Sequence, residues 1–240
     1  MRAAGVPSRR RCRPPLAERT ATIVVVAKPG VARDIARVPG ARRRAEGYLA
    51  ASGDCHAARG RGDPGRGIAD KARANKRMIY HYFGSKEDLF KAVLEEAYLD
   101  IRTAEQALDL DTLPPREALI RLVTFTWQYY LDNPEFIRLV NSENLHEARH
   151  IKASDRLRDV SRRFTGMTAD ILARGEREGT FRTGIDALQL NVTIAAIGYY
   201  YLTNRFTGAV LYERDFMSPE ALDARLRFNI ETILRLVERP

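Results

Sequence analysis

The stretch NKRMIYHYFGSKEDLF, Asn75 to Phe90, decides the fold of this chain. It carries two cationic residues, then a run of rings at residues 80–83, then a glycine. A short helix buries only one side of such a run, so some of the rings must face outward. Ile79 and Phe83 lie four residues apart and share the face that packs on a scaffold. The opposite face is left for a partner.

The flanking residues predict a helix on each side of this segment. Upstream, GRGIADKA (residues 65–72) places Ile68 on an apolar face, and RAN then breaks the helix. Two short helices with a tight break between them predict a helix-turn-helix. Gly84 is expected to end the second helix, and Ser85 with Asp88 predicts a capping box that opens a third.

The outward residues of the second helix have the chemistry that DNA recognition requires. Lys76 and Arg77 can reach phosphates, and arginine also bonds guanine edges in the major groove. The hydroxyl of Tyr80 can bond a phosphate while its ring packs on a sugar. The alternative from spacing alone is an ordinary helical hairpin with a charged surface.

At this point the sequence resembles a known family. The segment GIADKARANKRMIYHYFGSKEDLFKAVL is similar to the DNA-binding region of the tetracycline-repressor (TetR-type) bacterial transcriptional regulators. The residues that fall in register are Ile68, Ala69, Ile79, Tyr80, Phe83, Lys86, Glu87 and Leu89. The resemblance implies a DNA-binding set formed by Arg66, Lys76, Arg77, Tyr80, His81, Tyr82 and Lys86.

Long amphipathic helices are expected to follow, so the predicted fold class is all-α. Proline or serine marks several helix starts, at Pro114–Pro115, at Asn133–Pro134 and at Ser218–Pro219. The stretch from Gly184 to Phe206 is apolar through its middle and is expected to form one covered helix. No convincing strand and no internal repeat occurs after residue 63.

Three regions follow from this organisation. Residues 1–63, rich in Arg, Ala, Gly and Pro, are interpreted as a disordered or atypical basic segment. Residues 64–105 form the helix-turn-helix region, although the family's first helix is not recognisable. Residues 113–240 form a larger helical domain for effector binding and dimerisation. Residues 1–67 hold 15 basic and five acidic side chains, a balance of +10 that suggests a polyanionic partner.

The resemblance also implies an effector pocket and a homodimer. Rings mixed with polar groups suit a largely apolar pocket, and the candidates are Trp127, Tyr130, Phe136, Asn144 and His146. The two last long helices are expected to pair across a two-fold axis through Leu190, Ile194, Ile197, Tyr201, Leu226, Ile230 and Ile233. Packing within one chain is the alternative for both sets. The expected function is a regulator, a repressor of a palindromic operator on double-stranded DNA, released by a small-molecule effector.

The sequence HEARH at residues 146–150 raises a different function. It fits H-E-x-x-H, in which two histidines on one helix face bind zinc and the glutamate acts as general base. A zinc hydrolase is therefore one alternative to the regulator, and a dimeric helical ligand-binder that no longer binds DNA is another. A catalytic zinc needs a third protein ligand, and IKASDR downstream supplies neither Gly nor His. No enzyme, metal or cofactor is expected.

The composition favours a protein that stays in the cytoplasm. No apolar run approaches the roughly 20 residues that span a bilayer, and TIVVVA (residues 22–27) is too short for a signal-peptide core. Cys12 and Cys55 do not suggest a secreted disulfide scaffold. We expect no membrane partner.

Overall fold

The computed structural model describes residues 83–239, apart from the side chains of Lys86 and of residues 158–164. Within this range the chain is helical, as predicted, and its β structure is an isolated antiparallel bridge between Phe181 and Glu238. The helices are α5 (Lys86–Gln106), the 3-10 turn η1 (Leu110–Thr112), α6 (Pro115–Asp132), α7 (Pro134–Leu145), α8 (Arg149–Lys152), α9 (Asp155–Arg177), α10 (Ala187–Thr203), α11 (Arg205–Leu211) and α12 (Pro219–Val237).

The helix starts follow the signals in the sequence. Pro115, Pro134 and Pro219 are the first residues of α6, α7 and α12, where a missing N–H costs nothing. The Ser218 hydroxyl accepts from the Ala221 N–H at 3.2 Å. Asn133 occupies the predicted cap position of α7, but its side chain does not cap that helix: its amide donates back to the Tyr129 carbonyl at 2.9 Å.

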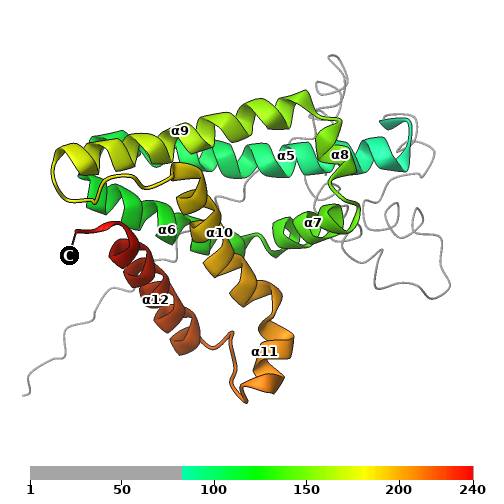
Figure 1. Ribbon diagram of the computed structural model, residues 1–240. Helices are drawn as coiled ribbons and strands as arrows, with labels where there is room; N and C mark the ends of the chain where they lie inside the picture. Colours follow the sequence, from blue (N-terminus) through cyan, green and yellow to red (C-terminus); the bar gives the residue numbers. More distant parts are fainter. Residues whose placement is uncertain (1–82, 240) are drawn as a thin grey trace, which may run out of the picture.

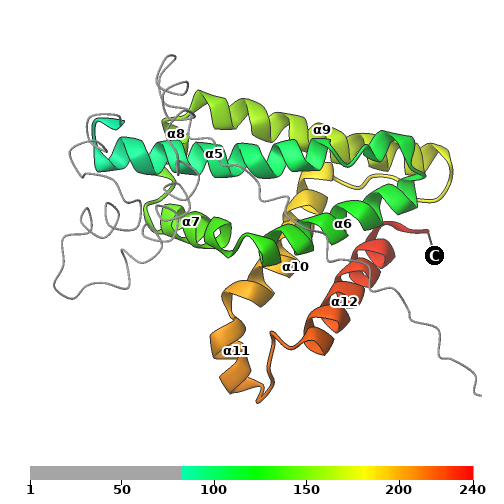
Figure 2. The same ribbon diagram turned by 180° about the vertical axis from the view of Figure 1, so that it is seen from behind.

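The central helix of the described region is α6. It contacts α5, α7, α9, α10 and α12, so residues from both ends of the described chain pack on it. Helices α5 and α9 lie side by side along one side of the molecule, while α10 and α12 diverge from the other side of α6 (Figures 1 and 2). Helix α11 lies at the far end of α10, where the chain turns back into α12.

Two apolar clusters divide the core. The first joins α5, the second half of α6, α7 and the last turn of α10, and the second joins the first half of α6 with η1, α9, the first half of α10 and α12. Side chains exposed by 4% or less line both clusters. The first contains Leu89, Val93, Leu94, Ala97, Ile101, Trp127 and Leu139; the second contains Leu119, Leu122, Ile171, Phe181, Leu190, Ile194 and Ile233.

The stretch from Gly184 to Phe206 does not form the single helix expected. Helix α10 ends at Thr203, and α11 starts at Arg205 after a break at Asn204. The Asn204 side-chain amide donates to the Tyr200 carbonyl at 3.0 Å. It thereby satisfies a carbonyl in the last turn of α10, and the chain can change direction there.

None of the described helices combines the length and the apolar character that a membrane span requires.

Candidate functional site

The described structure begins where the expected DNA-reading helix ends. Gly84 has a φ of +83°, which a glycine adopts without strain and which suits the predicted helix end. The Ser85 hydroxyl accepts from the Asp88 N–H at 3.0 Å and donates to the Asp88 carboxylate at 2.7 Å. The predicted cap is confirmed. Helix α5 therefore starts just after residues 75–83, the segment predicted to read DNA, which we call the reading segment.

The first residues of the described chain are already tied to the larger domain. Phe83, the ring expected to anchor the reading helix, is half-buried against the first apolar cluster. The DNA-facing candidates Arg66, Lys76, Arg77, Tyr80, His81 and Tyr82 lie outside the described residues, and Lys86 opens α5 with a side chain that is not described. Their assignment stays a prediction.

A cluster of aromatic rings from three helices surrounds Phe136 of α7. Its ring lies 5.4 Å from that of Tyr98 on α5, 5.7 Å from Tyr129 and 6.1 Å from Tyr130, both on α6. A fourth helix, α10, adds Tyr199, whose ring is 6.2 Å from that of Tyr130. We call these five rings the ring cluster.

The predicted pocket residues do not all join the ring cluster. Tyr130 and Phe136 belong to it, and Trp127 lies beside it in the same apolar core, with its ring 5.7 Å from Tyr201. Asn144 instead is exposed, and its amide donates to the Val140 carbonyl of its own helix at 2.9 Å. His146 lies beyond the end of α7, beside Phe90 at 6.3 Å.

Polar groups accompany the rings, and sequence reasoning missed them. Arg102 and Glu105 form an ion pair at 2.6 Å, with the Glu105 side chain 2% exposed. Burial raises the pKa of Glu105 to about 7, although Arg102 opposes the shift. The spacing of Tyr98, Ile101 and Glu105 along one helix face could have revealed this inward carboxylate.

The phenols of the ring cluster are held in their neutral form. Burial raises the pKa of Tyr130, with Arg102 and Glu105 near enough to act on it in opposite directions. Burial also raises the pKa of Tyr199 to about 12, and its hydroxyl donates to the Asn141 side chain. A neutral phenol can donate and accept, so the cluster offers hydrogen-bonding groups beside apolar faces.

The HEARH segment does not lie on one helix face. Helix α7 ends at Leu145, and Glu147 and Ala148 adopt positive φ values of 55° and 58° before α8 begins. The zinc-protease helix is therefore wrong as a description of this segment, because its i, i+4 geometry requires unbroken helix. Among the described residues no group of three or more His, Cys, Asp or Glu side chains could hold a metal ion.

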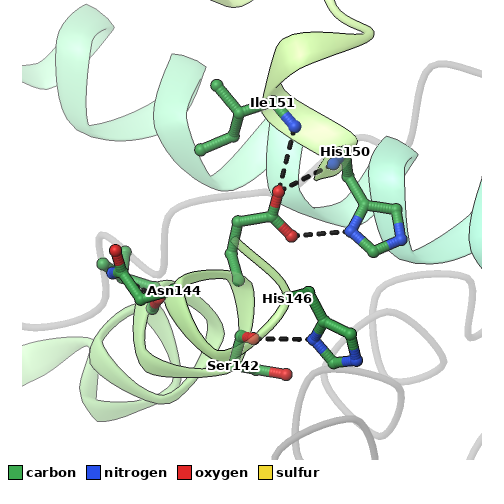
Figure 3. Close-up of polar contacts among 7 residues, drawn as sticks. Ser142, Asn144, His146, His150 and Ile151 are labelled. Carbon is green, nitrogen blue, oxygen red and sulfur yellow. Dashed lines mark hydrogen bonds and ion pairs between the residues drawn. The ribbon is translucent and has the colours of Figure 1, made fainter. Parts of the chain in front are cut away.

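The turn between α7 and α8 is instead held by hydrogen bonds to the buried carboxylate of Glu143. We call Glu143, His150 and Ile151 the joint; Figure 3 shows its hydrogen bonds. One carboxylate oxygen accepts from the backbone N–H groups of His150 and Ile151 at 2.8 and 3.0 Å. The other accepts from Nδ1 of the His150 ring at 2.6 Å. The carboxylate thus caps the start of α8 and fixes the turn that follows α7. His146 makes its own contact, with Nδ1 donating to the Ser142 carbonyl at 2.7 Å.

This joint rests on the first turns of α5. The His150 ring lies 4.8 Å from the ring of Phe90. The Lys91 ammonium donates to the Ala153 carbonyl at 2.7 Å, just after α8. The turn between α7 and α9 therefore contacts α5 close to the expected reading helix, while the ring cluster contacts α5 farther along.

The predicted dimer residues divide into two groups. Leu190, Ile194 and Ile233 are exposed by only 1%, 4% and 0% and pack in the second apolar cluster of their own chain. These three side chains therefore have little area left to offer a partner, and their assignment to a dimer interface stays a prediction. The remaining four, Ile197, Tyr201, Leu226 and Ile230, are half-buried.

The exposed apolar side chains lie on a neighbouring face of the same helices. On α10, Leu188, Val192 and Tyr200 are exposed by 53%, 55% and 68%, at helical spacing, and Phe228 of α12 is exposed by 58%. Because α10 is apolar nearly all round, periodicity alone could not separate its inner face from its outer face.

A predicted DNA-reading helix followed by a helical domain with an aromatic interior is what a DNA-binding transcriptional regulator would show. Comparisons with known proteins agree. The family model "Bacterial regulatory proteins, tetR family" matches residues 66–93, and "Tetracyclin repressor-like, C-terminal domain" matches residues 115–233.

Relatives extend this match over most of the chain. The HTH-type transcriptional repressor NicS of Pseudomonas putida (strain KT2440) is 38% identical over 172 residues, which is 72% of this chain and 81% of that protein. The chain belongs to the TetR family of bacterial transcriptional regulators, whose members are ligand-responsive DNA-binding proteins.

Solved structures share the fold. The regulator SCO4942 of Streptomyces coelicolor has a TM-score of 0.57 at 21% identity, over 83% of this chain and 99% of that one. A tetR-family protein from Rhodococcus RHA1 has a TM-score of 0.60 at 21% identity, over 82% of this chain and 98% of that one. The predicted all-α fold class is confirmed.

Proposed function

We propose that this protein is a homodimeric repressor that acts in the cytoplasm and leaves its operator when a small molecule binds near the ring cluster. The observation that carries the proposal is the course of α5. One end of this helix follows the reading segment, and its middle supplies Tyr98 to the ring cluster. A ligand that moved Tyr98 or its neighbours would act on the helix that holds the reading head.

The release needs two arrangements of the molecule rather than a gradual distortion. An effector shifts the balance only by the difference in its affinity for the two arrangements. Each subunit would carry one helix-turn-helix, which we call its reading head. We propose that in one arrangement the distance between the two reading heads matches successive major grooves of DNA, and that in the other it does not. The buried pair of Arg102 and Glu105 and the phenols of Tyr130 and Tyr199 would orient the polar groups of the effector.

The homodimer is proposed from the outer faces of α10 and α12. Leu188, Val192, Tyr200 and Phe228 leave a band of apolar surface that water would otherwise cover. A two-fold interface uses the same patch on both subunits, so the band on one subunit would pack on the same band of the other. A dimer would also account for a palindromic operator.

The reading head is tested by binding the full-length protein to the DNA upstream of its own gene. Replacing Arg77 or Tyr80 with alanine should weaken specific binding by about 1–3 kcal/mol. Arg177→Ala is the matched control, because it removes one exposed positive charge at the end of α9. A gel shift with competitor DNA measures all three. Unchanged affinity in both reading-helix variants would refute the role of that helix. No specific binding by the wild type would favour the helical ligand-binder that has lost DNA recognition.

A further inference from the structure

Helix α11 carries the most exposed group of large apolar side chains in the described part of the chain. Phe206, Val210, Leu211 and Tyr212 are exposed by 72%, 77%, 76% and 72%. They lie within and directly after a helix of seven residues, at the far end of α10 (Figure 1). Apolar side chains concentrated in this way mark an interaction surface more often than single exposed ones do.

The arm formed by α11 and the loop behind it is held in shape by its own contacts. The ring of Phe216 stacks on Tyr201 at 4.6 Å and on Tyr212 at 6.0 Å, and the Tyr201 hydroxyl donates to the Phe216 carbonyl at 3.0 Å. A Cβ placed on Gly208 would lie 2.7 Å from the Phe216 ring, so the glycine allows the ring to meet the helix backbone. A preformed arm loses little conformational entropy on binding.

Exposed apolar side chains occur on both of the consecutive helices α10 and α11. Leu188, Val192 and Tyr200 are exposed on α10, and Phe206 and Val210 are exposed on α11, which begins after one intervening residue. A partner that covers α10 as far as its last turn would therefore lie near the start of the arm.

The charged side chain of α11 contacts its neighbours in the same chain. Arg205 is the charged residue of this helix, and its guanidinium lies 4.4 Å from the centre of the Phe206 ring. It also donates to the Leu202 carbonyl at 2.7 Å. The remaining side chains of α11 are apolar or neutral, and exposed charges lie in the loop behind it, on Glu213, Arg214 and Asp215. Helix α11 itself therefore suits an apolar partner rather than a nucleic acid.

A standard dimer interface takes about 800 Å² from each partner, spread over many residues. The four exposed apolar side chains of the band on α10 and α12 form only part of such an area, and the four exposed side chains at α11 would enlarge it.

We propose that α11 is a dimerisation arm that packs on a second copy of this chain. The inference rests on the proposed homodimer and adds to it a part of the interface beyond the outer faces of α10 and α12. Because the contact is two-fold, the arm of each subunit covers an apolar surface of the other. Residues 205–212 are then buried in the assembled protein.

The arm is tested by sedimentation equilibrium of the full-length chain, which measures the dissociation constant of the dimer. Val210→Asp places a charge on an exposed position of α11 and should weaken the dimer at least about tenfold. Ala169→Asp adds the same charge to the exposed side of α9 and should leave the dissociation constant unchanged. Far-ultraviolet circular dichroism checks that both variants remain folded.

A second variant distinguishes a failure of the arm proposal from a failure of the homodimer proposal. Val192→Asp changes the outer face of α10 and should dissociate the dimer whether or not the arm takes part. If Val192→Asp is monomeric while Val210→Asp dimerises as the wild type does, the arm proposal is overturned and the homodimer stands. A monomeric wild type would overturn both. Binding of the wild type to phosphatidylglycerol vesicles, with an unaltered dimer in Val210→Asp, would also overturn the arm, because lipid would then be its partner.

Discussion

Glu143 shows how one side chain can determine the course of the backbone. Its carboxylate is 2% exposed and receives three hydrogen bonds, two from the backbone at the start of α8 and one from the His150 ring. The chain could not leave α7 and restart at Arg149 without an acceptor at this point. The joint in turn supports Phe90 on α5, next to the reading segment.

Removing the Glu143 carboxylate should lower the free energy of unfolding by much more than removing only its charge. Glu143→Ala leaves buried donors without a partner, and we expect a loss of about 3 kcal/mol in the free energy of unfolding. Glu143→Gln keeps an oxygen for the two backbone donors and should lose about 1 kcal/mol. Urea unfolding compares them with Glu147→Gln, an exposed neighbour that should change little. Equal losses in the alanine and glutamine variants would contradict this role.

The buried carboxylate of Glu105 should make stability depend on pH. Burial raises its pKa from the ordinary value of 4.5 to about 7, so the folded state binds this proton more tightly than the unfolded chain does. The resulting stabilisation is complete below pH 4.5 and is lost as the pH rises through 7. Glu105→Gln cannot ionise and should escape this loss.

The variant and the wild type should therefore diverge as the pH rises. The difference between their free energies of unfolding should grow in favour of Glu105→Gln by about 3 kcal/mol between pH 4.5 and pH 8. Urea midpoints at several pH values measure it, and titrations of other groups cancel in the comparison. Parallel curves for the two proteins would show that the pKa of Glu105 is the same in the folded and the unfolded state.

At the scale of elements, the sequence predicted helices better than the breaks between them. Proline and serine at Pro115, Pro134 and Ser218 mark helix starts through local rules, and these predictions are confirmed. The break at Asn204 and the turn at Glu147 depend on side-chain hydrogen bonds, from Asn204 to the Tyr200 carbonyl and from the backbone after Glu147 to Glu143. The apolar periodicity of the sequence does not reveal these contacts.

The structure places some of the predicted residues of the candidate site together and others apart. Trp127, Tyr130 and Phe136 were predicted because rings mixed with polar residues suit a pocket, and they share one apolar core. Asn144 is predicted on the same ground, as a polar group of the pocket, yet its side chain is exposed and bonds its own helix. The inner and outer faces of α10 could not be distinguished, because the helix is apolar nearly all round. The faces follow from the helices that pack on it.

A glycine pair on α9 tests how closely this helix packs on the segment that follows it. A Cβ on Gly175 would lie 2.0 Å from the ring of Phe181, which is fully buried, whereas a Cβ on Gly166 would meet nothing within 4 Å. Gly175→Ala should therefore destabilise the protein by about 1–3 kcal/mol or more. Gly166→Ala should stabilise it by roughly 0.5–1 kcal/mol through helix propensity.

Thermal or urea unfolding of the two variants measures this contrast. Both substitutions add the same methyl group to the same helix, so the difference between them reports the contact with Phe181 alone. Stabilisation by both alanines would mean that α9 and Phe181 are not in close contact.

At the scale of the whole molecule, the two apolar clusters lie next to different predicted functional parts: one near the reading segment and the other near the proposed dimer face. The first lies along α5 and meets Phe83, so it connects the helical domain to the reading head. The second joins α6, α9, α10 and α12, and the outer faces of α10 and α12 are proposed to meet the second subunit. A change around the ring cluster could reach the proposed dimer face through α6, which takes part in both clusters, and the segment predicted to read DNA through α5.

The charge of the chain is distributed as unevenly as its apolar surface. Residues 1–63 hold 14 basic and five acidic side chains, which equals the net charge of +9 for the whole chain. Residues 64–240 are therefore formally neutral. A protein that binds a polyanion through residues 64–240 alone would gain little from long-range attraction, whereas residues 1–63 would add interactions that do not depend on the DNA sequence.

Removal of residues 1–63 should therefore weaken non-specific DNA binding and flatten its dependence on salt. The slope of log K against log salt should become shallower by about 0.9 for every phosphate that the shortened chain no longer neutralises. Fluorescence anisotropy with a random duplex, measured at several KCl concentrations, compares the full chain with residues 64–240. Arg77→Ala in the full chain is the control and should lower the slope by only about 1. Equal slopes for the full and shortened chains would show that the basic segment does not bind DNA and that residues 64–240 carry all of the binding.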